Sequence, residues 1–156
     1  MNSNKITTLL FFLCLSVFGQ QQITVDEIFT GAFRAKGMDA LEALNNTNQY
    51  TVLNSDKSTK SMQIDLYDFA TLKKVSNLID TKDFKELAGG IDSYSFDASE
   101  KKILIATNKV KIFRHSFTAD YFLYDLTTKT LIKLFEKVQE PTFSPDGTKI
   151  AYAKEN

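Results

Sequence analysis

The sequence contains very little of several residue types, and each scarcity removes a class of chemistry. Tryptophan is absent, and cysteine and histidine occur once each, as Cys14 and His115. Cys14 lies in a segment that we expect to be removed, so the mature chain is expected to have no disulfide, thiolate nucleophile or cysteine-bound metal. One histidine among scattered carboxylates lacks the spacing of a metal site. We therefore expect no metal and no cofactor.

Catalytic and phosphate-binding signatures are missing as well. No serine stands in the Gly-x-Ser-x-Gly elbow of an α/β-hydrolase. Gly89 and Gly90 are interpreted as a loop pair and not as a glycine-rich phosphate cradle. His115 follows Arg114 at the start of a predicted strand, where a structural hydrogen-bonding role is favoured over that of a general base. The sequence therefore gives no catalytic residue.

An excess of charge of either sign is also absent. The chain has 19 Lys and Arg residues and 19 Asp and Glu residues, which give a formal net charge of zero at pH 7. This balance leaves no electrostatic footprint for nucleic acid or for an anionic membrane surface. We therefore expect neither as a partner. The 156 residues are enough for one domain with a core, and the 13 Phe and 6 Tyr favour β-structure.

Residues 1–20 have the pattern of a secretory signal peptide. A short segment with one cation, Lys5, precedes an apolar run from Ile6 to Phe18, and Gly19 supplies a small residue for cleavage. The run is shorter than the roughly 20 apolar residues that a membrane helix needs, so an uncleaved anchor is the less favoured alternative. A lipid anchor on Cys14 is weaker still, because small residues do not precede it. We expect a secreted or periplasmic protein with no membrane contact beyond this segment.

Residues 21–49 form a lead-in segment with one short predicted helix. Thr24 and Glu27 have the spacing of a capping box, which predicts a helix of one or two turns that starts at Thr24. We expect Ile28 and Phe29 to pack on the edge of the domain that follows.

From Tyr50 to Asn156 the apolar residues repeat with a period of two, which predicts short β-strands. Residues 81–88 can form a helical turn or two, and the state of residues 38–44 is left open. The expected fold class is therefore all-β. The predicted strands are Tyr50–Leu53, Met62–Tyr67, Lys74–Ile79, Tyr94–Phe96, Lys102–Thr107, Ala119–Leu126, Leu131–Phe135, Pro141–Phe143 and Lys149–Ala153.

Two pairs of similar segments indicate an internal repeat. Residues 64–71 align with residues 121–128, and residues 96–103 align with residues 143–150. The members of each pair lie roughly 50 residues apart, and a repeat of that length with about four strands is typical of a β-propeller blade. Chance similarity between short hairpins is the alternative. Residues 50–156 are predicted to form an incomplete β-propeller of about two blades.

Two blades cannot close a propeller, because closed propellers have about four to eight blades. Strand edges and apolar faces that pair with a further blade would remain exposed. We therefore expect the sequence to be a fragment of a longer protein. The alternatives are that the chain assembles with another one, or that the two-blade interpretation is wrong.

One further segment narrows the interpretation to a family. The stretch Arg114–Tyr121 reads Arg-His-Ser-Phe-Thr-Ala-Asp-Tyr, Tyr124-Asp125 follows, and a Ser-Pro-Asp-Gly turn occupies residues 144–147. In such a turn Pro presets φ, Asp bonds its own backbone and Gly accepts a positive φ. Together these features resemble the N-terminal propeller domain of the dipeptidyl peptidase IV family of serine peptidases. Residues 23–29 also resemble the family's lead-in, so the likeness covers about residues 23–156.

The resemblance implies one substrate-binding residue, Arg114. In the family this arginine faces the cavity between the propeller and the hydrolase domain, where it helps to hold the backbone carbonyl of a bound peptide. A planar guanidinium with several donors suits such an acceptor. Phe117 replaces the family's tyrosine, which removes a hydroxyl contact. From the residues alone, the alternative role of Arg114 is a salt bridge at the surface or between blades.

The resemblance also implies a function for the longer protein, namely that of a secreted dipeptidyl or tripeptidyl peptidase whose propeller gates peptide entry and positions the peptide N-terminus. Cleavage is expected after proline or a small residue, and a homodimer is expected only of the full-length protein. The family's paired glutamates and its hydrolase domain with a Ser-Asp-His triad would lie beyond Asn156. A peptide substrate is thus expected only together with that domain, and this chain alone should be inactive. A non-enzymatic, propeller-type binding module of the cell envelope is the alternative.

Overall fold

The computed structural model of the protein describes residues 23–34 and 41–154, which belong to two units, residues 1–38 and residues 39–156. The predicted signal peptide, residues 1–20, lies outside the described residues. Within the described part of the chain, no helix has the length and apolar character needed to cross a membrane.

The first unit contains helix α2 (Val25–Thr30), which begins where the capping box predicts. The Glu27 carboxylate accepts a hydrogen bond from the Thr24 backbone N–H at 2.8 Å, and the Thr24 hydroxyl accepts one from the Glu27 backbone N–H at 3.2 Å. The hydrogen bonds from Thr24 hold the pKa of Glu27 below its usual value. Ile28 and Phe29 are exposed, so their packing on the edge of the domain stays a prediction.

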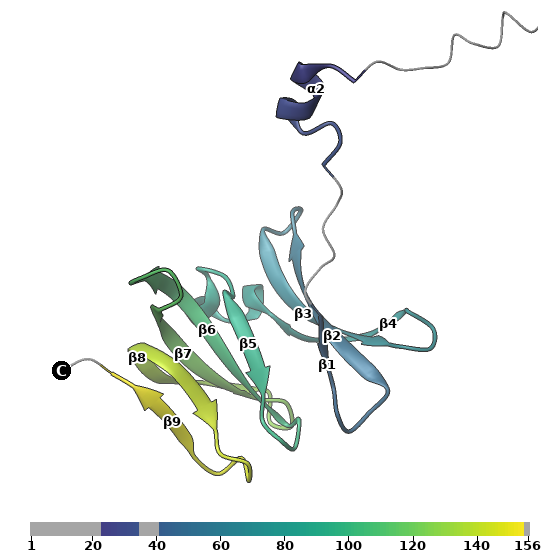
Figure 1. Ribbon diagram of the computed structural model, residues 1–156. Helices are drawn as coiled ribbons and strands as arrows, with labels where there is room; N and C mark the ends of the chain where they lie inside the picture. Colours follow the sequence, from purple (N-terminus) through teal and green to yellow (C-terminus); the bar gives the residue numbers. More distant parts are fainter. Residues whose placement is uncertain (1–22, 35–40, 155–156) are drawn as a thin grey trace, which may run out of the picture. The chain divides into compact units, whose positions relative to one another are not determined.

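The second unit consists of two antiparallel sheets, in which each strand pairs with the next along the chain (Figure 1). The first sheet has the order β1-β2-β3-β4, and the second has the order β5-β6-β7-β8-β9. Two short 3₁₀ helices, η2 (Thr81–Asp83) and η3 (Lys85–Leu87), lie between the sheets in sequence and confirm the helical turns predicted there. The strands are β1 (Leu41–Ala43), β2 (Gln49–Asp56), β3 (Ser61–Asp68), β4 (Lys74–Asp80), β5 (Ser93–Phe96), β6 (Lys102–Lys111), β7 (Phe117–Asp125), β8 (Thr130–Phe143) and β9 (Ile150–Ala153).

Strand β6 is apolar on both faces because each face packs against a different cluster. Ile103 and Ile105 point into one cluster, whereas Leu104 and Ala106 point into the other. Successive side chains of a strand point to opposite sides of its sheet, so a strand with core on both sides needs a continuous apolar run. The sequence Ile-Leu-Ile-Ala at 103–106 meets that need.

The first cluster joins the two sheets. Ile64 of β3 and Ile79 of β4 pack with residues of β6 and β7, and Leu87 of η3 completes the cluster. Leu87 and Ile64 are fully buried, and full burial of an aliphatic side chain of this size contributes about 1.5–3 kcal/mol. The second cluster lies on the other face of the second sheet, where Val138 of β8 packs with β6 and β7.

The structure confirms the internal repeat as a repeat of strand positions. Residues 64–71 and residues 121–128 both begin in the third strand of a sheet and continue into its outer turn. Residues 96–103 and residues 143–150 both run from the end of one strand through a turn into the next strand. The first sheet is therefore one blade and strands β5 to β8 of the second sheet form the next, so the described strands make up the partial β-propeller that the sequence predicts.

Strand β8 differs from the prediction, which placed two separate strands at 131–135 and 141–143. It is one strand of 14 residues that pairs first with β7 and then with β9. Lys137 and Glu140 have positive φ values of 51° and 47°, and the pairing of β8 with both neighbours contains register shifts. Such irregular pairing bends a strand without ending it. The hairpin formed by the last residues of β8 and by strand β9 thus repeats the β5–β6 hairpin of the preceding blade.

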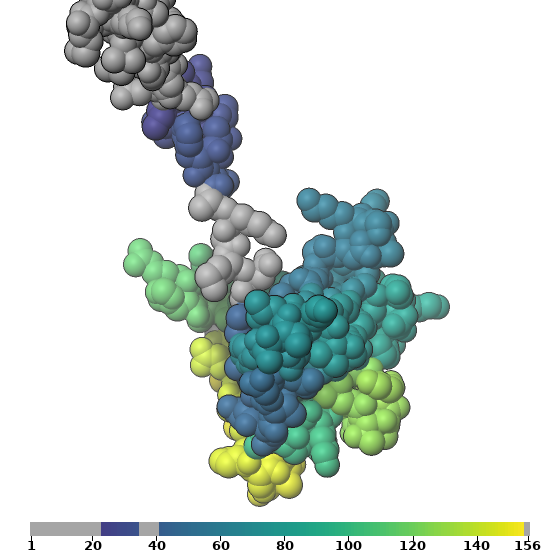
Figure 2. Space-filling view, turned by 90° about the vertical axis from the view of Figure 1, so that its right-hand side faces the viewer, coloured from purple at the N-terminus to yellow at the C-terminus, as the bar shows by residue number. Residues whose placement is uncertain are grey.

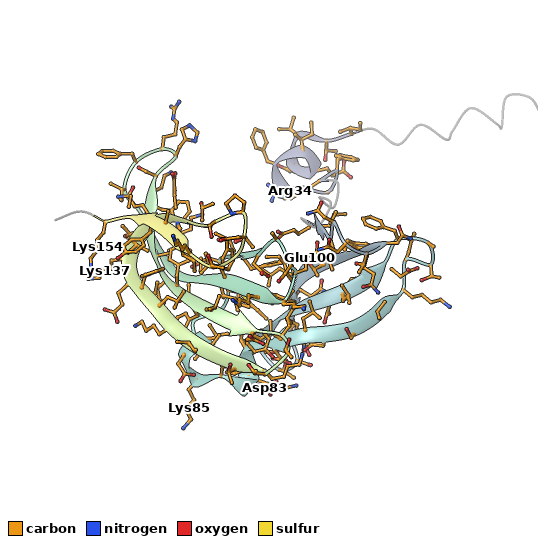
Figure 3. All side chains as sticks on the ribbon, turned by 90° about the horizontal axis from the view of Figure 1, so that it is seen from below. Arg34, Asp83, Lys85, Glu100, Lys137 and Lys154 are labelled. Carbon is orange, nitrogen blue, oxygen red and sulfur yellow. The ribbon has the colours of Figure 1, made fainter. Side chains whose placement is uncertain are left out.

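Strand β1 lies in the segment whose state the sequence left open. Leu41 pairs with Val52 and Ala43 pairs with Tyr50, both in antiparallel register. The first sheet therefore begins at Leu41, within the range 21–49 that was predicted as the lead-in segment. Glu100 links the turn after this strand to the second sheet (Figure 3), since its carboxylate accepts hydrogen bonds from backbone N–H groups at 45 and 46.

Candidate functional site

Arg114 lies at the tip of the hairpin formed by β6 and β7. Residues 112–116 make the turn, in which the Ser116 carbonyl accepts hydrogen bonds from the backbone N–H groups of Ile112 at 2.9 Å and Phe113 at 3.3 Å. Arg114 and His115 are both exposed. Figure 2 shows this tip as the green segment that projects from the surface at the left of the view. The turn therefore presents the guanidinium to solvent.

A β-bulge below the tip sets the direction of the hairpin. The pairing of β6 with β7 shifts between Thr107 and Val110, and Asn108 has a φ of 55°. The Asn108 side chain donates a hydrogen bond to Asp120 Oδ2 at 3.0 Å, and the Lys109 backbone N–H donates one to Asp92 Oδ2 at 2.8 Å. An extra residue in one strand bends and twists a ladder. Both carboxylates hold that bend in place.

A surface pocket of about 540 Å³ lies along one side of this hairpin, and we call it the tip pocket. It brings together the predicted site residue Arg114 with cationic, aromatic and acidic side chains from the hairpin and from the segment before β5. Its lining residues are Asp92, Lys109, Lys111, Phe113, Arg114, His115, Ser116 and Phe117.

The cations of the tip pocket are not used in ion pairs within the described part of the chain. The Lys109 ammonium lies 3.6 Å from the centroid of the Phe117 ring, in the geometry of a cation–π contact. No carboxylate oxygen of residues 23–34 or 41–154 lies within 4.0 Å of the charged groups of Lys109, Lys111 or Arg114. The alternative role of Arg114, a salt bridge at the surface or between blades, is therefore not seen among these residues.

A second, smaller pocket of about 210 Å³ lies where the first sheet meets the second, and we call it the junction pocket. Asp92 lines both pockets, so the two are neighbours. Glu42 and Tyr94 also line the junction pocket. Burial raises the pKa of the Glu42 carboxyl, and a backbone hydrogen bond from Phe96 opposes this only in part. Asp92 thus lines one pocket with the half-buried carboxylate of Glu42 and another with several cations.

The described side chains do not form a hydrolytic centre. His115 makes no hydrogen bond to a serine, threonine or carboxylate within the described ranges, so neither a general base nor the structural hydrogen-bonding role that the sequence favoured is seen. No group of three or more potential metal ligands occurs in residues 23–34 and 41–154. The arrangement can instead hold a peptide carbonyl or carboxylate through its guanidinium and ammonium groups.

The sequence named Arg114 as the candidate substrate-binding residue but did not name the residues that line the pocket with it. The alternation of β6 places Lys109 and Lys111 on one side, and that signal was available in the sequence. Asp92 and Glu42 gave no signal, because Asp92 lies in a connecting segment and Glu42 in a segment of open state. The pairing of β5 with β6 brings Asp92 next to the β6–β7 hairpin, where its backbone N–H donates a hydrogen bond to the Ala106 carbonyl at 2.9 Å. The packing of the two blades brings Glu42 into the junction pocket, which Asp92 also lines.

Comparison with known proteins gives one consistent result. Residues 97–156 match the family model described as the dipeptidyl peptidase IV (DPP IV) N-terminal region. The chain is 38% identical over 84 residues to dipeptidyl peptidase 4 of Felis catus, which covers 52% of this chain and 11% of that protein. It is 31% identical over 108 residues to dipeptidyl aminopeptidase B of Saccharomyces cerevisiae, which covers 68% of this chain and 12% of that protein.

One solved structure with a similar fold is also a dipeptidyl peptidase. The crystal structure of Porphyromonas gingivalis dipeptidyl peptidase 4 superposes with a TM-score of 0.72 and 27% sequence identity. The superposition covers 88% of this chain and 20% of that one. The chain therefore spans only a small part of the length of each relative.

Proposed function

On the premise that this chain is the N-terminal part of a peptidase of the dipeptidyl peptidase IV type, we propose that it forms the propeller side of the substrate cavity in a serine exopeptidase. In this proposal the propeller gates the entry of peptides and positions their N-terminus. The nucleophile comes from residues outside this chain, because these 156 residues contain no Gly-x-Ser-x-Gly elbow. The expected reaction is release of an N-terminal dipeptide or tripeptide after proline or a small residue.

The observation that carries the proposal is the state of Arg114. It is exposed at the tip of a braced hairpin and has no ion-pair partner in the described part of the chain. Its neighbours Ser116 and Phe117 continue the motif on which the resemblance rests. The turn that carries Arg114 is closed by backbone hydrogen bonds, and a guanidinium without a carboxylate partner among the described residues can donate to a backbone carbonyl of a peptide.

The test is steady-state kinetics of the full-length protein on a Gly-Pro anilide, which has no charged side chain. Loss of a charge-assisted hydrogen bond in the transition state costs about 1.5–3 kcal/mol, so Arg114→Ala should lower kcat/KM by about tenfold to a hundredfold. Arg114→Lys should recover only part of this loss, because an ammonium lacks the planar fork of donors. The matched control is Lys85→Ala, an exposed cation on η3. Unchanged kinetics in Arg114→Ala would return this residue to a structural role.

We also propose that the protein is exported, since the apolar run after Lys5 has the form of a signal peptide. Determination of the N-terminal residue of the protein in envelope and periplasmic fractions tests this. A mature N-terminus near Gln20 or Gln21 is expected. An N-terminus that still contains Met1 in the soluble cytoplasm would contradict export.

A further inference from the structure

The tip pocket carries more positive charge than its surroundings neutralise. Lys109, Lys111 and Arg114 line it together with one carboxylate, that of Asp92. Within residues 23–34 and 41–154, none of these cations has a carboxylate oxygen within 4.0 Å. The Asp92 carboxylate accepts a hydrogen bond from the Lys109 backbone and not from its ammonium. The excess positive charge is therefore available to a ligand.

The geometry of the hairpin places the two lysines on the same face. Alternate residues of a strand point to one side, and the pocket lining includes Lys109 and Lys111 but not Val110 between them. Phe117 pairs with Lys111 across the hairpin and lines the same pocket. Two ammonium groups and one aromatic ring thus share the face on which the pocket lies.

The contact of Lys109 with Phe117 orients a charge without cancelling it. The ammonium nitrogen lies 3.6 Å from the ring centroid. A ring attracts a cation through its quadrupole, but it carries no net charge. An ammonium held in this way keeps its positive charge and has N–H donors on the side away from the ring. It therefore differs from a lysine in a salt bridge, whose charge is already paired.

We propose that Lys109 and Lys111 form a carboxylate-binding subsite beside Arg114 that favours anionic peptides. This inference rests on the proposed function, in which Arg114 holds the peptide backbone. The carboxylate can come from an acidic side chain of the peptide or from its free C-terminus, because an ammonium is a compact charge that accepts either. Asp92 limits the subsite on one side and disfavours a second anion there.

The experiment uses the full-length protein and two matched pairs of substrates. Glu-Pro and Gln-Pro anilides differ only in a side-chain carboxylate, and Gly-Pro-Ala with a free C-terminus or as its amide differs only in the terminal carboxylate. The test variant is the double substitution K109M/K111M, since methionine keeps an aliphatic chain against Phe117 and removes the charge. The control is K85M, because Lys85 is exposed on η3 and projects away from the ribbon (Figure 3).

The wild-type protein should favour the anionic member of at least one pair by about fivefold in kcat/KM, as expected for a partly exposed ion pair. K109M/K111M should lose that preference and K85M should keep it. About 0.5 M salt should also reduce the preference of the wild type, because exposed charges are screened. Equal preference in the wild type and the double variant, or none in either pair, would overturn the subsite.

The two proposals fail in different ways. If Arg114→Ala lowers turnover of the Gly-Pro anilide but K109M/K111M leaves the anionic preference intact, only the carboxylate subsite is overturned. If Arg114→Ala leaves that turnover unchanged, the proposed role of Arg114 is overturned and the subsite loses its basis.

Discussion

The Tyr94 hydroxyl on β5 lies 2.8 Å from the Thr51 hydroxyl on β2, and this hydrogen bond joins the two blades. Thr51 is fully buried. Its other polar contact is a longer one, 3.4 Å from its hydroxyl to the Glu42 carbonyl oxygen. We expect Tyr94→Phe to lower the free energy of unfolding by about 1 kcal/mol, because it removes one hydrogen bond from a buried hydroxyl. Denaturant unfolding of the full-length protein measures this, with the exposed Tyr152 changed to Phe as the control. Equal midpoints for the two variants would contradict the role of this bond.

Stability should fall at alkaline pH because buried tyrosines resist ionisation. Burial raises the pKa of Tyr94, Tyr121 and Tyr124 above the ordinary value of 10.0. A group whose folded pKa is raised stabilises the fold below its unfolded pKa and loses this contribution as pH rises through the folded pKa. The free energy of unfolding should therefore decrease above pH 10, and less steeply in Tyr94→Phe. If the free energy of unfolding falls with the same slope above pH 10 in the wild type and in Tyr94→Phe, Tyr94 does not contribute to this pH dependence.

Stability should also fall in acid, and Asp97 is one cause. Burial alone raises the pKa of Asp97, but hydrogen bonds from Ser99 and from the backbone N–H groups of Lys102 and Lys101 outweigh it and leave the pKa below the ordinary 3.8. The stabilisation by a group of this kind is present above its unfolded pKa and is lost as pH falls through the lowered folded pKa. Asp97→Asn should be less stable at pH 7 by about 2 kcal/mol and should lose less stability below pH 3.8. Urea titrations at pH 7 and in acid measure both effects. If the wild type and Asp97→Asn lose the same free energy of unfolding below pH 3.8, the proposed contribution of Asp97 to acid unfolding is wrong.

Gly147 should not tolerate a side chain while Asp97 is present. Its φ is +67°, and a Cβ atom there would lie 3.0 Å from Asp97 Oδ2. Gly147→Ala should therefore cost about 1–2 kcal/mol from the left-handed backbone conformation, with a further contribution from the contact. Part of that cost should disappear when Asp97 is also changed to Ala, so a double-mutant cycle gives a measurable coupling. Strict additivity would show that the two turns do not contact each other in solution.

Local chemistry in the sequence was enough to predict much of the fold. The capping box at Thr24 and Glu27 predicted α2 because both partners lie within one helical turn. Alternation predicted most strands, since half-buried strands require it. The motif around Arg114 predicted the candidate site, because a short contiguous segment forms the tip of the hairpin.

Other features depend on packing that the sequence does not display. The residues Leu-Glu-Ala at 41–43 favour a helix by propensity, yet they form β1 because Val52 and Tyr50 offer them a strand edge. The sequence predicted separate strands at 131–135 and 141–143, whereas β8 runs through both ranges as its partner changes from β7 to β9. Asp92 joins the site because β5, which follows it, pairs with β6, and the sequence does not display this pairing.

The most direct test of the account is to isolate the native protein from envelope fractions of the source cells with an antibody against residues 21–156, and to analyse the products of a Gly-Pro peptide by mass spectrometry. The account predicts that the captured protein releases the N-terminal dipeptide, that an acetylated N-terminus blocks the release, and that a serine-directed inhibitor abolishes it. The isolated segment 21–156 should release nothing. A captured native protein without dipeptide release, or release by the isolated segment, would contradict the assignment of this chain to the propeller side of a serine exopeptidase.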